Sequence, residues 1–153
     1  MQTKDLDIFF KQYELGVEMA DKISQRRGEN NKFYSTILLA LSSTIIAIFK
    51  NNVYQHIDFI CVLSLLGIAI SIVWIFNIRS YTTLNKAKFK VLFDMEKNLP
   101  YKLYSEEYQY LNEYEHLSLN KIEKKIPIIF IIAFILIILF SLLKIVFFWF
   151  QQS

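Results

Sequence analysis

The stretch FICVLSLLGIAISIVWIFNI, residues 59–78, has no charged residue over 20 positions and decides the class of this protein. Two further stretches are also free of charge: FYSTILLALSSTIIAIF (33–49) and IPIIFIIAFILIILFSLL (126–143). A helix needs about 20 mostly apolar residues to cross a hydrocarbon core about 30 Å thick. Because too little polar chain remains in 153 residues to cover three such helices, the sequence predicts an all-α integral membrane protein with three transmembrane helices.

The overall composition excludes several other classes. The chain is 54% hydrophobic and has only 3 Gly and 2 Pro, fewer than strands and turns require. The single cysteine, Cys61, excludes a disulfide scaffold, and the apolar content excludes intrinsic disorder. A net charge of +3, spread along the chain, argues against nucleic acid as a partner.

The distribution of basic residues predicts how the chain is oriented. Fifteen of the 17 Lys and Arg residues lie in 1–32 and 79–125, and only Lys50 and Lys144 lie elsewhere. Loops rich in Lys and Arg stay in the cytoplasm. We therefore expect a cytoplasmic N-terminus, a cytoplasmic middle region and a C-terminus on the outer side.

The chain reads as a single membrane domain, residues 1–153, whose cytoplasmic parts are amphipathic helices. We expect a helix over 1–32 before the first span (33–49). The second span (59–78) should continue as a cytoplasmic helix to 98, with Val91 packed on the N-terminal helix. A Tyr-rich helical segment (101–125), capped by Ser105, should lead into the third span (126–150), with a break at Pro127.

No catalytic, cofactor-binding or metal-binding motif occurs in the sequence. His56 and His116 fall on opposite sides of the predicted membrane, and with one cysteine they leave no zinc ligand set. Glu106 and Glu107 are adjacent, so they point apart on a helix and do not form a carboxylate pair. We therefore expect that the protein is not an enzyme and needs no cofactor or metal.

Small and hydroxylated residues form stripes at helical spacing in the first two spans, whereas the third span is almost uniformly bulky and suits a position facing lipid. The stripes are Thr36, Ala40, Ser43 and Ala47 in the first span and Ser64, Gly67 and Ser71 in the second. Such stripes let helices approach closely in lipid. They predict either packing of spans one and two within one chain, or a subunit interface or pore in a homo-oligomer.

Two segments carry a resemblance to a known family: ADKISQRRGENNKFY (20–34) and, from Trp74 to Tyr108, W-x4-RSYTTLNKAKFKVLFDMEKNLPYKLYSEEY. Together they resemble small bacterial integral membrane proteins of about 150 residues, and more loosely the SLATT-type membrane effectors of antiphage and nucleotide-signalling systems. The resemblance implies a role in antiviral defence at the bacterial inner membrane. It also implies a juxtamembrane motif that fixes the cytoplasmic helices to each other and to the membrane surface: Arg26, Arg27, Asn31, Arg79, Tyr81, Asn85, Lys88 and Glu96.

Three functions remain open at this point. The first is an effector that oligomerises and permeabilises the membrane. The second is a membrane anchor or scaffold that recruits a cytosolic defence enzyme through the Tyr-rich helix, and the third is a holin-like toxin. The expected partners are the lipid bilayer, further copies of the chain and a cytosolic defence-system protein.

Overall fold

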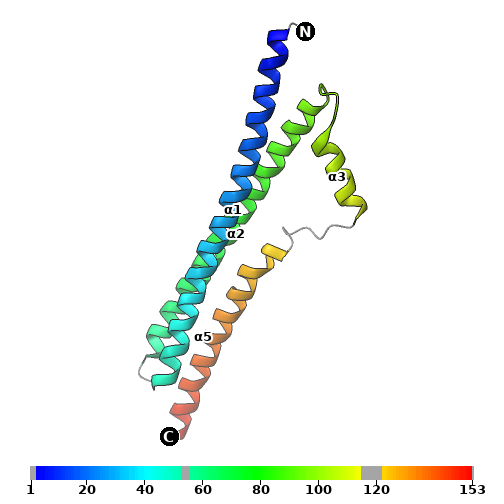
Figure 1. Ribbon diagram of the computed structural model, residues 1–153. Helices are drawn as coiled ribbons and strands as arrows, with labels where there is room; N and C mark the ends of the chain where they lie inside the picture. The colour runs from blue at the N-terminus through cyan, green and yellow to red at the C-terminus, as the bar shows by residue number, and fades with distance from the viewer. Residues whose placement is uncertain (1–2, 53–55, 115–121, 153) are drawn as a thin grey trace. The chain divides into compact units, whose positions relative to one another are not determined.

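The computed structural model describes residues 3–52, 56–114 and 122–152, and within them the chain forms helices and no strands. The helices are α1 (Thr3–Asn52), α2 (Ile57–Glu96), α3 (Leu103–Glu113) and α5 (Lys125–Gln152), as Figure 1 shows. Among these, α1, α2 and α5 are long and apolar enough to cross a membrane. The predicted fold class, an all-α protein with three candidate membrane-spanning helices, is confirmed.

Two helices extend well beyond the apolar stretches that they contain. The 50 residues of α1 join the amphipathic N-terminal segment to the first apolar stretch without interruption. The 40 residues of α2 continue past the second stretch and end at Glu96, two residues before the predicted end. There the amides of Asn98 and Leu99 donate to the carbonyls of Met95 and Glu96 at 3.1 and 3.0 Å, which turns the chain just before Pro100.

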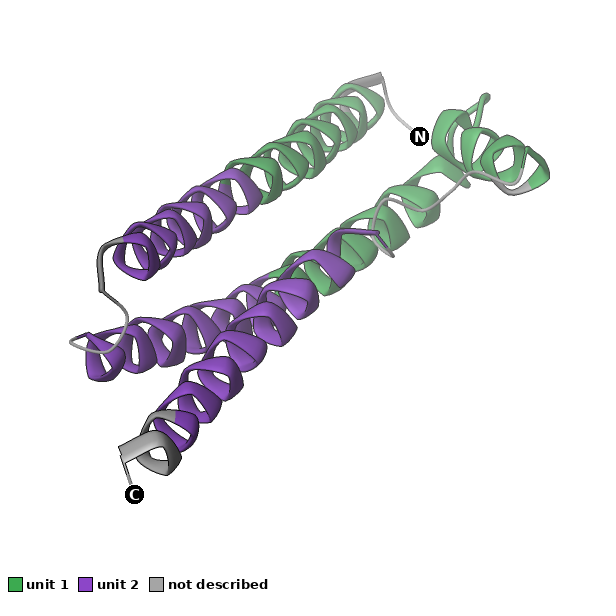
Figure 2. Cartoon of the chain, turned by 90° about the horizontal axis from the view of Figure 1, so that it is seen from below, with its two compact units in different colours: residues 1–29, 78–121 green, residues 30–77, 122–153 purple. Residues whose placement is uncertain are grey.

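The chain divides into two compact units, coloured separately in Figure 2. Unit 1 comprises Met1–Glu29 and Ile78–Lys121, and it contains the polar halves of α1 and α2 together with α3. Unit 2 comprises Asn30–Asn77 and Ile122–Ser153, and it contains the three apolar stretches apart from the last residue of the second, Ile78. The division between the units therefore follows the change from polar to apolar sequence along the chain.

Within unit 2, the buried positions recur at intervals of three and four residues, which is the spacing of helices that cross at a shallow angle. On α5 the buried residues among 125–147 are Pro127, Phe134 and Ser141, which lie seven positions apart, the sum of these two intervals. On α2 they are Ile57, Ile60, Ser64, Gly67, Ser71 and Trp74. The third span consequently buries one face against its own chain, while its other faces remain exposed.

In unit 1, α2 also packs on α1, but it does so through a different face from the one predicted. Leu92 is 1% exposed, and its Cδ2 atom would lie 3.0 Å from a Cβ placed on Gly16. Val91 is 57% exposed, so the prediction that Val91 packs on the N-terminal helix is wrong. The cause is that apolar residues occupy two neighbouring faces of this part of α2, and the sequence pattern alone selected the wrong one.

Two expected helix boundaries also differ from the structure. Ser105 lies inside the first turn of α3, which begins two residues earlier at Leu103. The break predicted at Pro127 falls instead at Lys124, just before α5 begins. Pro127 occupies the first turn of α5, where the amide hydrogen that proline lacks would have no helical acceptor. His116 lies outside the described residues.

Candidate functional site

A fully buried carboxylate, that of Glu96, joins three helices in unit 1. Its Oε1 accepts hydrogen bonds from the Tyr13 hydroxyl of α1 at 2.9 Å and from the Tyr104 amide of α3 at 2.7 Å. Its Oε2 accepts from the Ser105 amide at 3.0 Å and from the Ser105 hydroxyl at 2.7 Å. The first amides of a helix lack partners within it and carry partial positive charge, so Glu96 caps α3 from the end of α2.

Aromatic contacts extend this junction along the inner face of α3. The Tyr104 ring meets Phe89 edge to face at 5.7 Å between centroids, and the Tyr108 ring lies 5.9 Å from Phe93. Burial raises the pKa of the Tyr104 phenol, and the nearby carboxylates of Asp21, Glu107 and Glu96 raise it further. Tyr104 therefore remains a neutral phenol at physiological pH.

The outer face of α3 is aromatic and exposed. Tyr110 is 55% exposed, and Tyr114, which directly follows the helix, is 78% exposed. The helix carries Glu106, Glu107 and Glu113 and no basic residue. Exposed tyrosines are enriched in protein contact surfaces, whereas glutamates are depleted there.

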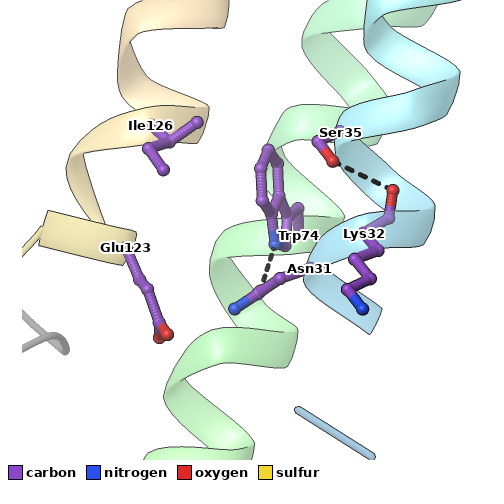
Figure 3. A pocket seen from close by; sticks show the side chains of 6 residues that line it. All are labelled: Asn31, Lys32, Ser35, Trp74, Glu123 and Ile126. Carbon is purple, nitrogen blue, oxygen red and sulfur yellow. Dashed lines mark hydrogen bonds between the residues drawn. The ribbon is translucent and has the colours of Figure 1, made fainter. Parts of the chain in front are cut away.

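A second polar cluster lies in unit 2, where the three apolar stretches meet polar sequence. The Trp74 indole N–H donates to Asn31 Oδ1 at 2.8 Å, and the indole stacks on Tyr34 with centroids 6.0 Å apart. Beside this pair is a cavity of about 240 Å³, drawn in Figure 3, that reaches to α5. Its walls come from Asn31, Lys32, Ser35, Trp74, Glu123 and Ile126.

The structure places the two predicted small-residue stripes in different environments. On α1, Thr36, Ala40, Ser43 and Ala47 are all exposed. On α2, Ser64, Gly67 and Ser71 are buried. A Cβ placed on Gly67 would lie 2.5 Å from Phe134 Cε2, so this stripe receives the third span of the same chain. The α2 stripe is thus occupied by packing within the chain, and the α1 stripe is not.

The predicted juxtamembrane motif is divided between the units: Asn31 belongs to unit 2, and the other seven residues belong to unit 1. Arg26 and Arg79 are exposed, whereas Arg27 and Tyr81 are half-buried. The Lys88 ammonium donates to the Met19 sulfur at 3.7 Å, which joins α2 to α1. Asn85 Oδ1 is buried without a hydrogen-bond partner in the described part of the chain.

The partners of these residues could not be identified from the sequence pattern. Tyr13 and Ser105, which bind Glu96, and Trp74 and Glu123, which border the cavity, were not singled out as site residues. The presence of Tyr13 on the apolar side of an amphipathic helix was the one available signal, because a phenol buried there needs a hydrogen-bond partner. Among the described residues, no group of three or more His, Cys, Asp or Glu side chains could hold a metal ion.

Comparison with known proteins gives one match that covers most of the chain. Residues 10–143 match the family described as "Octameric membrane protein family (8xMP)". Neither the curated proteins nor the solved structures include a match to this chain.

Proposed function

The chain belongs to the octameric membrane protein family, and on that basis we propose that it works as a ring of identical subunits joined through the exposed stripe of α1. The family description supports a homo-oligomer in the membrane. The observation that supports a contact through α1 is the difference between the two small-residue stripes. One stripe is filled by the third span of its own chain, and the other is exposed in the part of the chain that the structure describes.

The α1 stripe has the chemistry of a close helix contact in lipid. Small side chains such as Ala40 and Ala47 let two helix backbones approach, which increases dispersion contact between helices. The Ser43 hydroxyl donates to the Leu39 carbonyl of its own helix at 2.8 Å. Its hydrogen therefore has a partner before assembly, and burying the stripe leaves no donor at Ser43 unsatisfied.

Assembly would also give the protein a route to permeabilise a membrane. Three helices packed about 8–10 Å apart enclose no aqueous path. Several copies arranged in a ring could enclose one between them. We propose that the assembled ring permeabilises the bacterial inner membrane as an effector or accessory of antiphage defence. The effector role depends on the family resemblance of segments 20–34 and 74–108.

Replacing Ala40 with leucine tests the assignment of the contact. The change adds bulk to the stripe without charge, and it should dissociate the oligomer while leaving the helices folded. The matched controls are Ala69→Leu on α2 and Ala133→Leu on α5, because both alanines are also exposed in unit 2. Native mass spectrometry should report smaller species for Ala40→Leu alone. An intact oligomer in Ala40→Leu, with dissociation in either control, would place the contact elsewhere.

Permeabilisation is tested separately in cells. Induced expression with a membrane-potential dye should show depolarisation and loss of viability for the wild type and for Ala69→Leu, but not for Ala40→Leu. Phage plating on the same strains tests the defence role, because protection should be lost together with depolarisation. Depolarisation and killing without any effect on phage plating would favour a holin-like toxin.

The exposed tyrosines of α3 favour a second candidate, a membrane scaffold that recruits a cytosolic defence enzyme. In that case Tyr110→Ala and Tyr114→Ala should abolish phage protection while the oligomer mass stays unchanged, and the wild type should not depolarise cells. Depolarisation by the wild type that persists in both tyrosine variants would support the effector and exclude the scaffold.

A further inference from the structure

We infer that unit 1 carries both halves of a second contact between copies, in which α3 of one copy packs on an exposed apolar flank of α1 and α2 in the next. The inference rests on the proposed ring, since it requires neighbouring copies. Copies that cross the membrane in one orientation can be related only by an axis normal to the membrane, and more than two copies around such an axis meet head to tail. Each copy must therefore offer two different surfaces that fit each other.

The first surface is the outer side of α3, which we call the α3 face and which consists of Leu103, Tyr110 and Tyr114. These residues are seven and four positions apart, so they share one side of a helix. The Tyr114 amide donates to the Tyr110 carbonyl at 2.9 Å, which continues the helical turn to this residue. All three side chains are more than half exposed. Because tyrosine is enriched in protein contact surfaces, this face indicates a protein partner.

The second surface combines apolar residues of α1 and α2 with one lysine, and we call it the α1–α2 flank: Ile8, Leu15, Met19, Leu84 and Lys88. The three α1 residues have the same spacing of seven and four as the α3 face. The Lys88 ammonium lies 3.7 Å from the Met19 sulfur, so the two helices form one surface here. The four apolar side chains are 42–55% exposed. They lie outside the three apolar stretches, so the hydrocarbon core of the membrane does not account for their exposure.

The two surfaces lie on different sides of unit 1. The helix α3 contacts α2 through Phe89 and Phe93, which meet the rings of Tyr104 and Tyr108. Leu84 of the flank is five positions before Phe89, which places it about 140° around α2 at 3.6 residues per turn. The α3 face therefore does not cover the flank of its own chain. A rotation that relates two copies brings the α3 face of one to the flank of the next.

The charges around the two surfaces have opposite sign. The helix α3 carries exposed Glu107 and Glu113 and no basic residue. On the flank, Lys88 contacts the weakly accepting sulfur of Met19, and Arg26 lies seven positions after Met19 on the same side of α1. Within the described residues, neither of these two cations has a carboxylate partner. Glutamate is depleted from the centre of contact surfaces, so these carboxylates suit the rim, where opposite charges select the partner and its register.

This complementarity favours a second copy over other occupants of the two surfaces. An anionic membrane surface would attract the flank but would repel the carboxylates of α3, so it does not fit both. A neighbouring copy supplies the matching surface at each side, and a ring holds the two surfaces at high effective concentration. Tyr110 and Tyr114 accordingly bind the next subunit and not a cytosolic enzyme.

The test is disulfide cross-linking of the full chain in nanodiscs, in a Cys61→Ser background. One cysteine on the α3 face and one on the flank are combined in nine double variants: Leu103→Cys, Tyr110→Cys or Tyr114→Cys with Ile8→Cys, Leu15→Cys or Met19→Cys. A head-to-tail contact joins each copy to the next, so at least one double variant should give a ladder of covalent species that extends to eight copies on a denaturing gel. Chains with either cysteine alone should stay monomeric on the gel, because the contact brings unlike positions together.

Two further variants control for position and for charge. Tyr110→Cys combined with Lys90→Cys, an exposed position of α2 outside the flank, should give no ladder. Arg26→Glu with Lys88→Glu should lower the initial rate of cross-linking about fivefold, which corresponds to the contribution of about 1 kcal/mol expected of exposed ion pairs. Glu107→Lys with Glu113→Lys in the same chain should restore the rate.

The outcomes separate this contact from the ring itself. If the wild type has the mass of a ring and none of the nine double variants forms a ladder, the inference is overturned and the proposed ring stands. A wild type that is monomeric in native mass spectrometry contradicts the ring and, with it, this contact. Covalent dimers of single-cysteine chains would show a two-fold contact and would overturn the head-to-tail arrangement. An unchanged rate after reversal of the flank charges would also overturn the inference, because the two surfaces would then not be complementary.

Discussion

Replacing Glu96 with glutamine should release α3 from unit 1 while the helices themselves persist. The wild-type carboxylate accepts two hydrogen bonds on each oxygen, four in total. Glutamine keeps the shape of the side chain but offers a single acceptor oxygen and an NH₂ group. If its oxygen serves Tyr13 and Tyr104, its NH₂ group meets the amide and hydroxyl of Ser105, and the Ser105 amide loses its acceptor.

The size of the effect follows from this count. Hydrogen bonds to a charged group contribute about 1.5–3 kcal/mol each and neutral ones about 0.5–1.5 kcal/mol. The variant loses one charged bond, about 1.5–3 kcal/mol. The other three bonds share the same carboxylate, so their energies do not add, and we take the loss of their charge assistance as about 0.5–1 kcal/mol together. The free energy that holds α3 in place should therefore fall by about 2–4 kcal/mol. Each tenfold change in an equilibrium corresponds to about 1.4 kcal/mol. The protection of the α3 amides against hydrogen exchange should therefore fall about 30-fold to several hundredfold.

Hydrogen exchange followed by mass spectrometry on peptides that contain Tyr104 and Ser105 measures this loss directly. Asp94→Asn is the matched control, since Asp94 is an exposed carboxylate on the same helix whose partner is Lys97 at 2.6 Å. The control should leave exchange in α3 unchanged, because exposed ion pairs contribute little. Wild-type protection of α3 in Glu96→Gln would refute the conclusion that this carboxylate holds the helix.

Three further predictions concern packing and orientation. Gly67→Ala should lower the free energy of unfolding, measured in thermal melts, by about 1–3 kcal/mol, because the added methyl group meets the Phe134 ring. A Cβ placed on Gly28 has no atom within 4 Å, so Gly28→Ala should be neutral or should stabilise α1 by about 0.5–1 kcal/mol. Leu92→Asp should prevent folding or lower the melting temperature sharply, and Val91→Asp should melt like the wild type; the opposite order would mean that the α2 face is wrongly assigned. A cysteine at Gln152, in a chain without its native cysteine, should react only with reagents added outside the cell, and labelling from the cytoplasm would reverse the predicted orientation.

The helices could be predicted from the sequence because their causes are local. Charge-free stretches of 17 to 20 residues determine where a chain can cross a membrane, and Pro100 marks where α2 cannot continue. The face that each helix buries was harder to predict. The segment 84–92 offers two apolar faces, and which of them packs depends on α1, so Val91 was chosen in place of Leu92.

The contacts of the candidate sites lay beyond local reasoning. Tyr13 and Glu96 are 83 positions apart, and Asn31 and Trp74 are 43 apart, so no spacing rule relates either pair. The small-residue stripes illustrate the same limit. Both were visible in the sequence, yet only the packing of Phe134 on Gly67 distinguishes a stripe that serves the chain itself from one that a neighbouring subunit could cover.

The central claim is that this chain assembles into a ring of identical subunits in the membrane. The most direct test is the mass of the wild-type protein released from nanodiscs in native mass spectrometry, without any mutation. Eight copies of an 18.2 kDa chain give a predicted mass of about 146 kDa before bound lipid is added. A single species at the monomer mass, at every lipid-to-protein ratio, would contradict the account.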